Sequence, residues 1–451
     1  SEETSSLAAF LILPFLFFPI TTKRKKGQSA CRPSKVEVRD SFITHLRSHS
    51  EVKETITRRK EKETGIYVNT DVFKGILKFE LGVLVGDNLG IHSITGFVES
   101  FSSNYPCRVC KMRKDEIKKQ CYVDKTMLRT VEQYYFDVIE GNVSDSGIKE
   151  GCVWNNVQGF NVLDQVGMDV MHDILEGVGK YDLAFLILYY VEDLKLFSLQ
   201  VLNERLVCFD FGPDKGSKPS VLNIDYIRKH SIRLSASEML TLIRYFGLII
   251  GDFVPRNDPI WCLYISLRHI VDIVLSTSIQ KDCCVLLKTL VSEHNNLYIK
   301  YSKLDLKPKY HFMQHYHTII EQLGPLVHLW SMRFEAKHRI FKTVANTTSN
   351  RRNICMSLAI KHQLQLNNMF LKGTLSNDIE SSPSNKLICD SDVKNIKNFL
   401  EIDSFDSLVC CSWISIKGTK YKHKMILTLD INENSLPKFG VIDAIYLCNN
   451  R

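Results

Sequence analysis

The stretch Leu81-Gly82-Val83-Leu84-Val85-Gly86, followed directly by Asp87-Asn88-Leu89-Gly90, gives the clearest indication of a fold in this chain. A short, continuous apolar run is typical of a strand that is buried on both faces. The stretch therefore predicts a buried central strand with a carboxylate, Asp87, at its carboxyl end. An Asp in that place is more often a turn former or a helix cap than a metal ligand, so this pattern leaves both roles open.

Helical patterns dominate the middle of the chain, beyond a polar and turn-rich stretch over residues 100–160. They cover Met168–Gly179, Leu183–Leu196, Ser235–Ile250, Trp261–Ser276 and Tyr310–Leu323. Gly324-Pro325 ends the last of these, and a further helix begins near Ser331 and carries Glu335. Residues 408–429 and 439–447 have the Val, Ile, Trp and Tyr content of strands, so a small β-rich module is expected to close the chain.

The composition is that of a globular protein, with 44% hydrophobic and 24% charged residues. The formal net charge of +8 is a mild basic excess, which is weak evidence for a polyanionic partner. The run Lys23-Arg24-Lys25-Lys26 reads either as a nuclear signal or as a solvated basic tail. The apolar stretch Leu7–Ile20 contains two prolines and is shorter than the about 20 residues of a spanning helix. We interpret it as aberrant or disordered sequence, with a membrane anchor as the alternative, and expect no membrane partner.

Cysteines are numerous but scattered, which fits a reducing compartment, and Cys107-Arg108-Val109-Cys110 is the CxxC pair among them. Two thiolates at this spacing can bind one zinc ion if two further ligands are found. His311 and His315 lie four positions apart on a predicted helix, which places both imidazoles on one face. The two pairs together predict a Cys2His2 structural zinc site, whereas the simpler alternative is a polar helix face.

A polar stripe runs along the helix predicted at Met168–Gly179. Its members recur at i, i+3, i+4 and i+7 and are Asp169, His172, Asp173 and Glu176. An amphipathic surface helix explains this pattern most simply. The functional alternative is that Asp169 and His172 face an active site as hydrogen-bonding or metal-adjacent groups.

The order of several blocks in the chain is specific. The blocks are Asp87–Gly90, Gly96–Ser102, Cys107–Cys110, Asp169–Gly177, Lys309–Tyr316 and Leu329–His338. In this order they resemble blocks of transposon-encoded proteins of the CACTA/EnSpm-like superfamily of DNA transposases, which is distantly similar to the V(D)J recombinase catalytic subunit. The resemblance spans about Asp71 to Leu371 and continues more weakly into the C-terminal module.

The resemblance implies an α/β fold with an RNase H-like catalytic core, interrupted by a large, mainly α-helical insertion that contains the zinc site. In that superfamily three acidic residues hold two divalent ions, Mg²⁺ or Mn²⁺. Asp87 matches the second acid and Glu335 the third. Asp169 and His172 match the Asp-x-x-His block near the active site. The CxxC pair matches a zinc-binding pair that is completed by two histidines shortly before the catalytic glutamate.

The implied activity is DNA cleavage and strand transfer. Carboxylates are the hard oxygen ligands that Mg²⁺ prefers, and two such ions can support an in-line phosphodiester displacement. The basic residues that flank Glu335 can contact DNA phosphates, or they form a solvated helix face; they are Arg333, Lys337, Arg339 and Lys342. The expected partners are DNA and, as an open alternative to a monomer, a second copy of the chain, and the expected location is the nucleus.

The expected organisation follows the chain in successive segments. These are a poorly ordered or aberrant segment 1–65, a remnant of the RNase H-like sheet 66–100, the helical insertion 101–328, the catalytic helix and end of the core 329–373, a linker 374–388 and a small β-rich module 389–451.

The first catalytic acid is not recognisable. An RNase H-like sheet needs about 50 residues or more between its first and second acids. Asp71 lies too close to Asp87, and Asp40 lacks a preceding apolar strand. Enzymatic activity therefore stays undecided between an active transposase and a transposase-derived remnant or host-adopted protein that binds DNA or partners without cleaving. A purely structural, zinc-stabilised helical protein is a third and weaker alternative.

Overall fold

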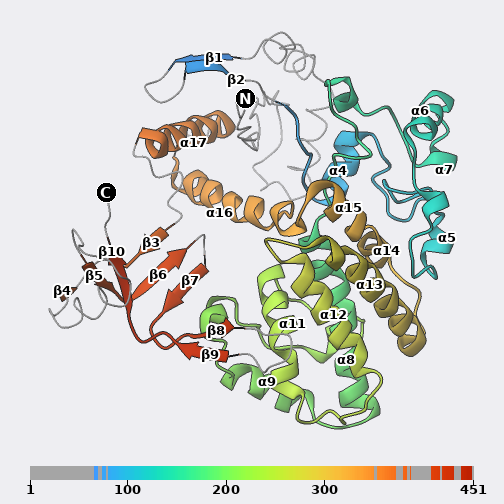
Figure 1. Cartoon of the computed structure of the whole chain (residues 1–451). Coiled ribbons are helices and arrows are strands. Elements are labelled where there is room, and N and C mark those ends of the chain that lie inside the picture. Colours follow the sequence, from blue (N-terminus) through green and yellow to red (C-terminus); the bar gives the residue numbers. More distant parts are fainter. Residues whose placement is uncertain are drawn as a thin grey trace. The chain divides into compact units, whose positions relative to one another are not determined.

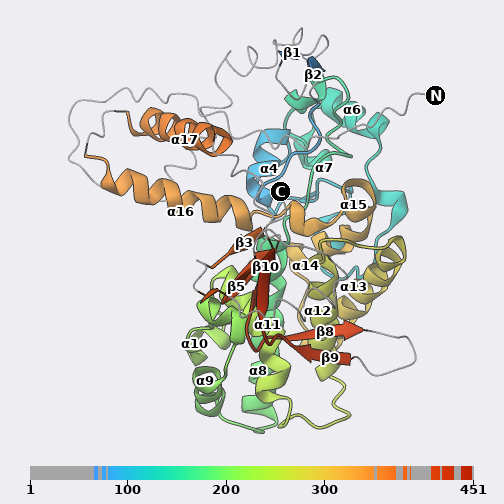
Figure 2. The same cartoon turned by 60° about the vertical axis from the view of Figure 1, so that its left-hand side comes forward.

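The chain is mixed α and β, mostly helical, and forms two compact units, Ser1–Arg351 and Arg352–Arg451 (Figures 1 and 2). The computed structural model describes residues 66–69, 74–77, 80–349, 353–371, 379–382, 386–387, 408–416, 419–430 and 438–448. The expectations for residues 1–65, with Asp40, and the position of Asp71 lie outside this part of the chain.

The first unit begins with an antiparallel hairpin of β1 (Ile66–Asn69) and β2 (Lys74–Leu77). The helix α4 (Asn88–Thr95) follows, and Asp87 is its N-cap, with Oδ1 accepting a hydrogen bond from the Gly90 backbone N–H at 2.6 Å. Asp87 therefore has the helix-capping role that this position most often has.

The apolar run Leu81–Gly86 is extended, but the prediction of a buried central strand is wrong for the described residues. Its contact with another extended segment is an isolated parallel bridge between Leu84 and Val166, held by two backbone hydrogen bonds of 2.9 Å. Most of its side chains are half-buried and divide between two apolar clusters. The run is apolar because both of its sides meet a hydrophobic core, and this does not require neighbouring strands.

Short helices follow α4 and surround the CxxC loop. They are α5 (Lys114–Ile117), η1 (Lys125–Met127), α6 (Val131–Glu140), α7 (Val143–Ser146) and η2 (Val153–Asn156). A small apolar cluster, which includes Ile91, Phe97 and Tyr134, packs α4 against α6 and the loops around them.

A long continuous helix crosses the main core of the first unit. It consists of η3 (Met171–Val178, π-helical), α8 (Gly179–Leu188) and η4 (Tyr189–Asp193, π-helical). The sequence predicts two helices here, Met168–Gly179 and Leu183–Leu196, with Asp182 between them. In the structure Asp182 is fully buried and accepts hydrogen bonds from Tyr310 and His294, at 2.7 and 2.8 Å, so the helix continues through it.

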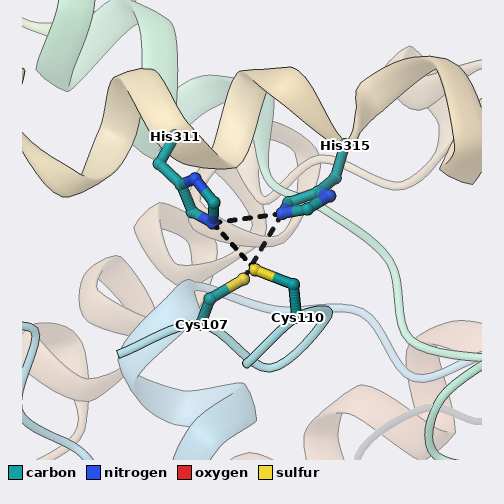
Figure 3. Close-up of side chains that lie close together, drawn as sticks. All are labelled: Cys107, Cys110, His311 and His315. Atoms are coloured by element: carbon teal, nitrogen blue, oxygen red, sulfur yellow. Dashed lines mark hydrogen bonds between the residues drawn. The ribbon is translucent and has the colours of Figure 1, made fainter. Parts of the chain in front are cut away.

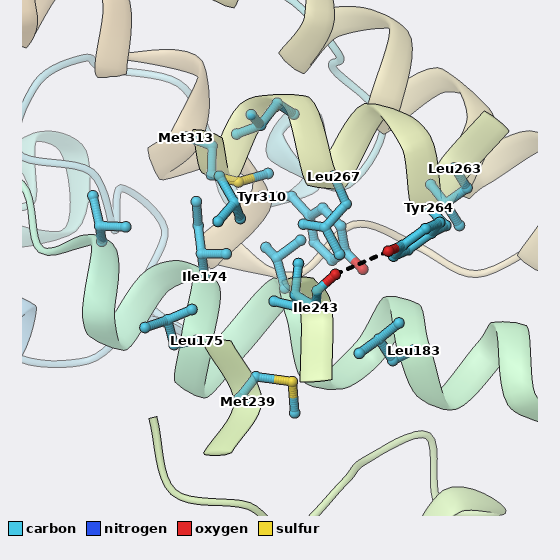
Figure 4. Close-up of a cluster of buried hydrophobic side chains, with 14 of the residues drawn as sticks. Ile174, Leu175, Leu183, Met239, Ile243, Leu263, Tyr264, Leu267, Tyr310 and Met313 are labelled. Carbon is cyan, nitrogen blue, oxygen red and sulfur yellow. Dashed lines mark hydrogen bonds between the residues drawn. The ribbon is translucent and has the colours of Figure 1, made fainter. Parts of the chain in front are cut away.

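Further helices pack around this long helix. They are α9 (Leu199–Cys208), η5 (Gly212–Ser217), α10 (Ile224–Ile227), α11 (Ala236–Ile250), α12 (Trp261–Val274), α13 (Lys281–Ser302), α14 (Pro308–Gln314), α15 (Tyr316–Leu323), η6 (Leu326–His328) and α16 (Met332–Thr347). Figure 4 shows apolar side chains such as Ile174, Leu183, Ile243 and Leu267 meeting in the core between them. The Tyr264 hydroxyl donates to the Ile243 carbonyl at 3.0 Å, which satisfies two polar groups inside this core (Figure 4).

The predicted helices correspond to observed ones, but their divisions differ in places, and several observed helices, α9 among them, have no predicted counterpart. The helix predicted at Tyr310–Leu323 is divided into α14 and α15 at His315. The long helix α13 has no counterpart in the sequence prediction. Gly324 ends α15 in a left-handed conformation, with φ of 84°, as the Gly-Pro pair predicts.

The second unit contains α17 (Ile354–Leu371) and short antiparallel strands. The strands are β3 (Ile379–Ser381), β4 (Lys386–Leu387), β5 (Leu408–Cys411), β6 (Trp413–Ile416), β7 (Thr419–Lys422), β8 (Ile426–Asp430), β9 (Lys438–Val441) and β10 (Ile445–Cys448). They pair in the orders β3-β6-β7, β10-β5-β4 and β8-β9. A small C-terminal β module is thus present, and the segment expected to be a linker contributes β3 and β4 to it.

Among the helices that the structure describes, none combines the length and the apolar character needed to cross a membrane.

Candidate metal centre and carboxylate cluster

Two segments far apart in the sequence bring four potential metal ligands together. Cys107 and Cys110 come from the loop before α5, and His311 and His315 come from α14 and its C-terminal end. Figure 3 shows both imidazoles pointing from the helix toward the two sulfur atoms. None of the four residues is more than 2% exposed. The juxtaposition expected from the CxxC pair and the i, i+4 histidines is therefore present.

The distances within this Cys/His cluster, the name used below for Cys107, Cys110, His311 and His315, match those around a tetrahedral zinc ion. Cys107 Sγ lies 3.5 Å from His315 Nε2, Cys110 Sγ lies 3.2 Å from His311 Nε2, and the two Nε2 atoms are 3.2 Å apart. Zinc bonds of ordinary length at tetrahedral angles separate S from N by about 3.5 Å and N from N by about 3.3 Å. The buried Cys2His2 set can thus hold a structural metal such as zinc.

The two thiols have very different proton affinities. Burial acts to raise the pKa of Cys107, but the hydrogen bond with Cys110 and the positive charge available on His315 and His311 bring it well below its ordinary value. The hydrogen bond with Cys107, followed by burial, raises the pKa of Cys110 well above its ordinary value. Zinc binding would displace protons from the thiols, since both sulfur ligands bind as thiolates.

The second ring nitrogen of each histidine, Nδ1, is buried without a hydrogen-bond partner among the described residues. Zinc-bound histidines usually donate this N–H to a carboxylate or carbonyl oxygen, which orients the ring. In this cluster, packing and helix geometry orient the rings instead.

A second cluster lies at the start of η3 and is centred on His172. Asp169 is fully buried, and its Oδ1 accepts hydrogen bonds from the backbone N–H groups of Met171 and Ser331, at 3.2 and 2.9 Å. Its Oδ2 contacts His172 Nδ1 at 2.5 Å. The same carboxylate thus accepts from the first N–H of η3 and orients His172, while its bond to Ser331 ties the start of α16 to η3.

The other ring nitrogen of His172 faces acidic side chains. Nε2 lies 3.6 Å from Glu335 Oε1 and 4.0 Å from Glu176 Oε2. Burial acts to lower the pKa of His172, but the bond to Asp169 and the charges of Asp169, Asp87 and Glu176 outweigh it and raise the pKa above its ordinary value. We call Asp87, Asp169, His172, Glu176 and Glu335 the carboxylate cluster. In it, Asp169, Glu176 and Glu335 lie within 4.0 Å of the His172 ring nitrogens, and Asp87 acts on His172 through its charge.

Glu335 is the most exposed member of the carboxylate cluster. Its side chain is 55% exposed, whereas that of Asp169 is 0% exposed. An exposed carboxylate can bind an ion that arrives from solvent. A carboxylate that is fully buried and hydrogen-bonded positions its neighbours instead. We therefore distinguish Glu335 as a potential ligand from Asp169 as an orienting group.

The polar stripe is buried at Asp169 and Asp173 and partly exposed at His172 and Glu176, so it is not the solvated face of a surface helix. Asp169 and Asp173 are fully buried, and His172 is 23% exposed. The helix is π-helical from Met171 to Val178, a geometry that occurs often at functional sites. Lys309 Nζ donates to the His172 and Glu176 carbonyls at 2.6 and 3.1 Å, which satisfies backbone groups of this helix. The stripe was misassigned because its polar groups are paired within the protein.

The basic residues around Glu335 lie on α16. Arg333, Arg339 and Lys342 are exposed and Lys337 is half-buried. Glu335, Arg339 and Lys342 recur at i, i+4 and i+7, which places them on one helix face. In both views α16 extends away from the helical body of its unit (Figures 1 and 2).

Sequence reasoning missed the buried residues that connect the two clusters. Arg108 is 4% exposed and donates to Asn88 Oδ1 at 2.8 Å, and Asn88 donates to Asp173 Oδ1 at 2.5 Å. Their positions, between the two cysteines and next to Asp87, could have indicated proximity. Nothing in the sequence indicates that they bond to each other.

No protein-family model matches the chain, and a search of curated proteins also finds no match.

Proposed function

We propose that this chain is a transposon-derived protein of the CACTA/EnSpm-like class that binds DNA in the nucleus and is similar to DDE-type transposases. The observation that carries the proposal is the convergence on His172. This imidazole contacts Glu335 at 3.6 Å and is influenced by the charge of Asp87, although these residues lie far apart in the sequence. Residues of three of the blocks that suggest the family, those with Asp87, His172 and Glu335, thus interact with one another.

The proposal includes an RNase H-like catalytic core in the first unit. Its support is the large helical region that separates Asp87 from Glu335 in the chain. In this view the Cys/His cluster fixes the inserted helices with a zinc ion. The carboxylates Asp87 and Glu335 would be ligands to Mg²⁺ or Mn²⁺, which supplies Lewis-acid chemistry for phosphodiester cleavage when bound.

DNA would lie along α16 in this proposal. Arg339 and Lys342 share a helix face with Glu335, so phosphates bound by these side chains would be close to the carboxylate. Phosphate contacts position a duplex but do not distinguish its base sequence, so this binding would have weak sequence specificity. A homodimer would place two such helices on one DNA molecule.

A second candidate function is DNA binding without cleavage. Asp87 Oδ1 is already bonded to the Gly90 N–H, and in the described part of the chain no further acid completes a three-carboxylate set with Asp87 and Glu335. Asp169 is engaged with two backbone groups and with His172. These contacts favour a remnant or host-adopted protein in which the basic helix still binds DNA.

Nicking of supercoiled plasmid DNA separates the two candidates. For a cleaving enzyme, we expect Mg²⁺- or Mn²⁺-dependent nicking by the wild type, and at least about a 100-fold loss in Glu335→Gln because a metal ligand is removed. The control is Glu321→Gln, which changes an exposed glutamate of α15. Nicking that survives in Glu335→Gln would contradict a catalytic Glu335. Absence of nicking by a zinc-loaded protein that still binds the plasmid would support the second candidate.

A further inference from the structure

Arg108 lies between the Cys/His cluster and the carboxylate cluster. It is the residue that follows Cys107, and its guanidinium is buried. Nη1 donates to Asn88 Oδ1 at 2.8 Å, and Nη2 donates to the Gly167 carbonyl at 2.7 Å. A planar guanidinium can bond two segments at fixed angles, which a single ammonium group cannot do.

The two segments that Arg108 bonds are the ones that carry the carboxylates. Asn88 is the first residue of α4 and follows Asp87, whose side chain caps that helix. Gly167 and Met168 directly precede Asp169, and the Met168 sulfur lies 2.9 Å from Arg108 Nη2. A shift of the CxxC loop would therefore be transmitted to Asp87 and Asp169 together.

Further hydrogen bonds lead from Asn88 through Asp173 to the residue that follows His315 in the Cys/His cluster. Asn88 Nδ2 donates to Asp173 Oδ1 at 2.5 Å, and the Tyr316 hydroxyl donates to Asp173 Oδ2 at 3.2 Å. Tyr316 follows the cluster residue His315. Asn88, Asp173 and Tyr316 are no more than 5% exposed. Buried hydrogen bonds of this kind restrain the groups that they join, although Arg108 Nε has no partner among the described residues.

Electrostatic interactions act between Arg108 and the acidic groups around it. Burial acts to lower the pKa of Arg108, while the negative charges of Asp173, Cys107 and Asp169 act to raise it. Burial and the charge of Asp169 raise the pKa of Asp173 to about 7, against the effect of Arg108.

We propose that Arg108 is a positioning residue that couples the Cys/His cluster to the carboxylate cluster. Zinc at the Cys/His cluster holds the CxxC loop, and Arg108 passes this constraint through Asn88 and Asp173 to the starts of α4 and η3. The part of this inference that concerns a divalent cation at Asp87 and Glu335 rests on the proposed function. Coupling between two binding sites is reciprocal, so that cation would also tighten zinc binding.

Arg129 provides a matched control for Arg108. It is also a buried arginine beside Cys107, but its Nη2 donates to the Cys107 and Ser146 carbonyls, at 3.1 and 2.7 Å. Its guanidinium lies 3.7 Å from Asp137 rather than beside Asn88. Arg108→Lys and Arg129→Lys each keep a positive charge next to the Cys/His cluster and remove one guanidinium fork.

Hydrogen–deuterium exchange of the full chain tests the coupling without any activity measurement. We expect Arg108→Lys, at unchanged zinc content, to speed exchange about tenfold in Asn88–Thr95 and Met171–Val178, as a lost second-shell contact does. Exchange in α12 should not change. Removing zinc from the wild type should speed exchange in the same two segments, and Arg129→Lys should not. If Arg108→Lys does not fold, Asn88→Ala cuts the same connection.

The coupling is overturned if exchange in both segments is unchanged in the Arg108 or Asn88 variant, or rises equally in Arg129→Lys. Mn²⁺ binding, followed by the electron paramagnetic resonance of the free ion, tests the proposed function separately. We expect about a tenfold weaker Mn²⁺ affinity in Arg108→Lys and a larger loss in Glu335→Gln. If the wild type binds no Mn²⁺, or Glu335→Gln binds it equally well, the cation site fails while the exchange result still decides the coupling.

Discussion

Histidine occupies two opposite environments in this chain. His311 and His315 are buried beside thiols and Arg108, and burial, the largest effect, lowers the pKa of His315. His172 lies among carboxylates, which raise its pKa. A neutral imidazole is a metal ligand, whereas an imidazolium neutralises acids and donates hydrogen bonds. The same side chain is therefore suited to metal binding in one cluster and to charge balance in the other.

Cys110→Ser tests the metal at the scale of one residue. We expect zinc to fall from about one ion per chain to near zero, because serine is a poor ligand in a closed tetrahedral site. The loss of bound metal should also lower the unfolding free energy by about 3–4 kcal/mol under zinc-saturating conditions. Metal analysis and thermal unfolding, with and without a chelator, measure both effects.

Cys121→Ser is the matched control for that change. Cys121 is also buried, but it lies outside the Cys/His cluster. The Cys121→Ser variant should keep its bound zinc and its sensitivity to the chelator. Equal zinc content in Cys110→Ser and wild type would contradict the assignment.

At the scale of the element, buried polar groups explain the forms of the central helices. Lys309 bonds to carbonyls of η3, and a Cβ at Gly177 would lie 2.3 Å from the Lys309 side chain. Gly177 therefore makes room for the lysine that satisfies the π-helix. Asp182, bonded to Tyr310 and His294, similarly allows a carboxylate inside α8. The helices continue because partners from α13 and α14 satisfy their polar residues.

The N-terminus of α11 makes a pH-dependent contribution to stability. Ser235 and Glu238 form a capping box, with Ser235 N–H donating to Glu238 Oε2 at 2.9 Å. Burial acts to raise the pKa of Glu238, but hydrogen bonds from Ser235 and Ser220 outweigh it and lower the pKa. An acid with a lowered folded-state pKa stabilises the fold above its unfolded-state pKa, and this stabilisation is lost as the pH falls through the folded-state value.

Glu238→Gln should therefore be less stable than the wild type by about 1 kcal/mol at pH 7, with the difference shrinking below about pH 4. Urea unfolding of both proteins at several pH values measures it. Glu293→Gln, an exposed glutamate in the middle of α13, serves as the control and should show a smaller difference. A difference for Glu238→Gln that grows toward low pH would contradict the sign.

At the scale of the whole molecule, the distribution of charge matters more than its net value. The formal charge of +8 is spread over two units and includes acids of the carboxylate cluster. The exposed basic residues of α16 form a local positive surface next to Glu335. Local clusters of this kind determine contacts with phosphates.

The double variant Arg339→Gln/Lys342→Gln tests the proposed DNA contact on α16. We expect weaker duplex binding. The slope of log affinity against log salt concentration should also become shallower by about 1.8, because each of the two lost phosphate contacts contributes about 0.9. Fluorescence anisotropy at several salt concentrations measures this slope. Lys281→Gln/Lys288→Gln, two exposed lysines of α13, removes the same charge elsewhere. An equal change in both double variants would show a non-specific charge effect only.

Much of the fold follows from local sequence patterns. Most of the predicted helices and the strands after residue 408 are present, because apolar periodicity, capping residues and Gly-Pro breaks act over a few residues. The apolar run before Asp87 was assigned wrongly as a central strand. A continuous apolar run indicates burial on both sides, but not whether neighbouring strands provide it.

The sequence alone determined which residues could act: the CxxC pair, the i, i+4 histidines, and the acids Asp87 and Glu335. Only the tertiary structure decided which of them meet. It placed the two pairs in one buried Cys/His cluster, turned the polar stripe of η3 inward, and connected the clusters through Arg108 and Asn88. These contacts depend on hydrogen bonds and charges between segments distant in the chain, and no periodicity or spacing within a single segment records such partners.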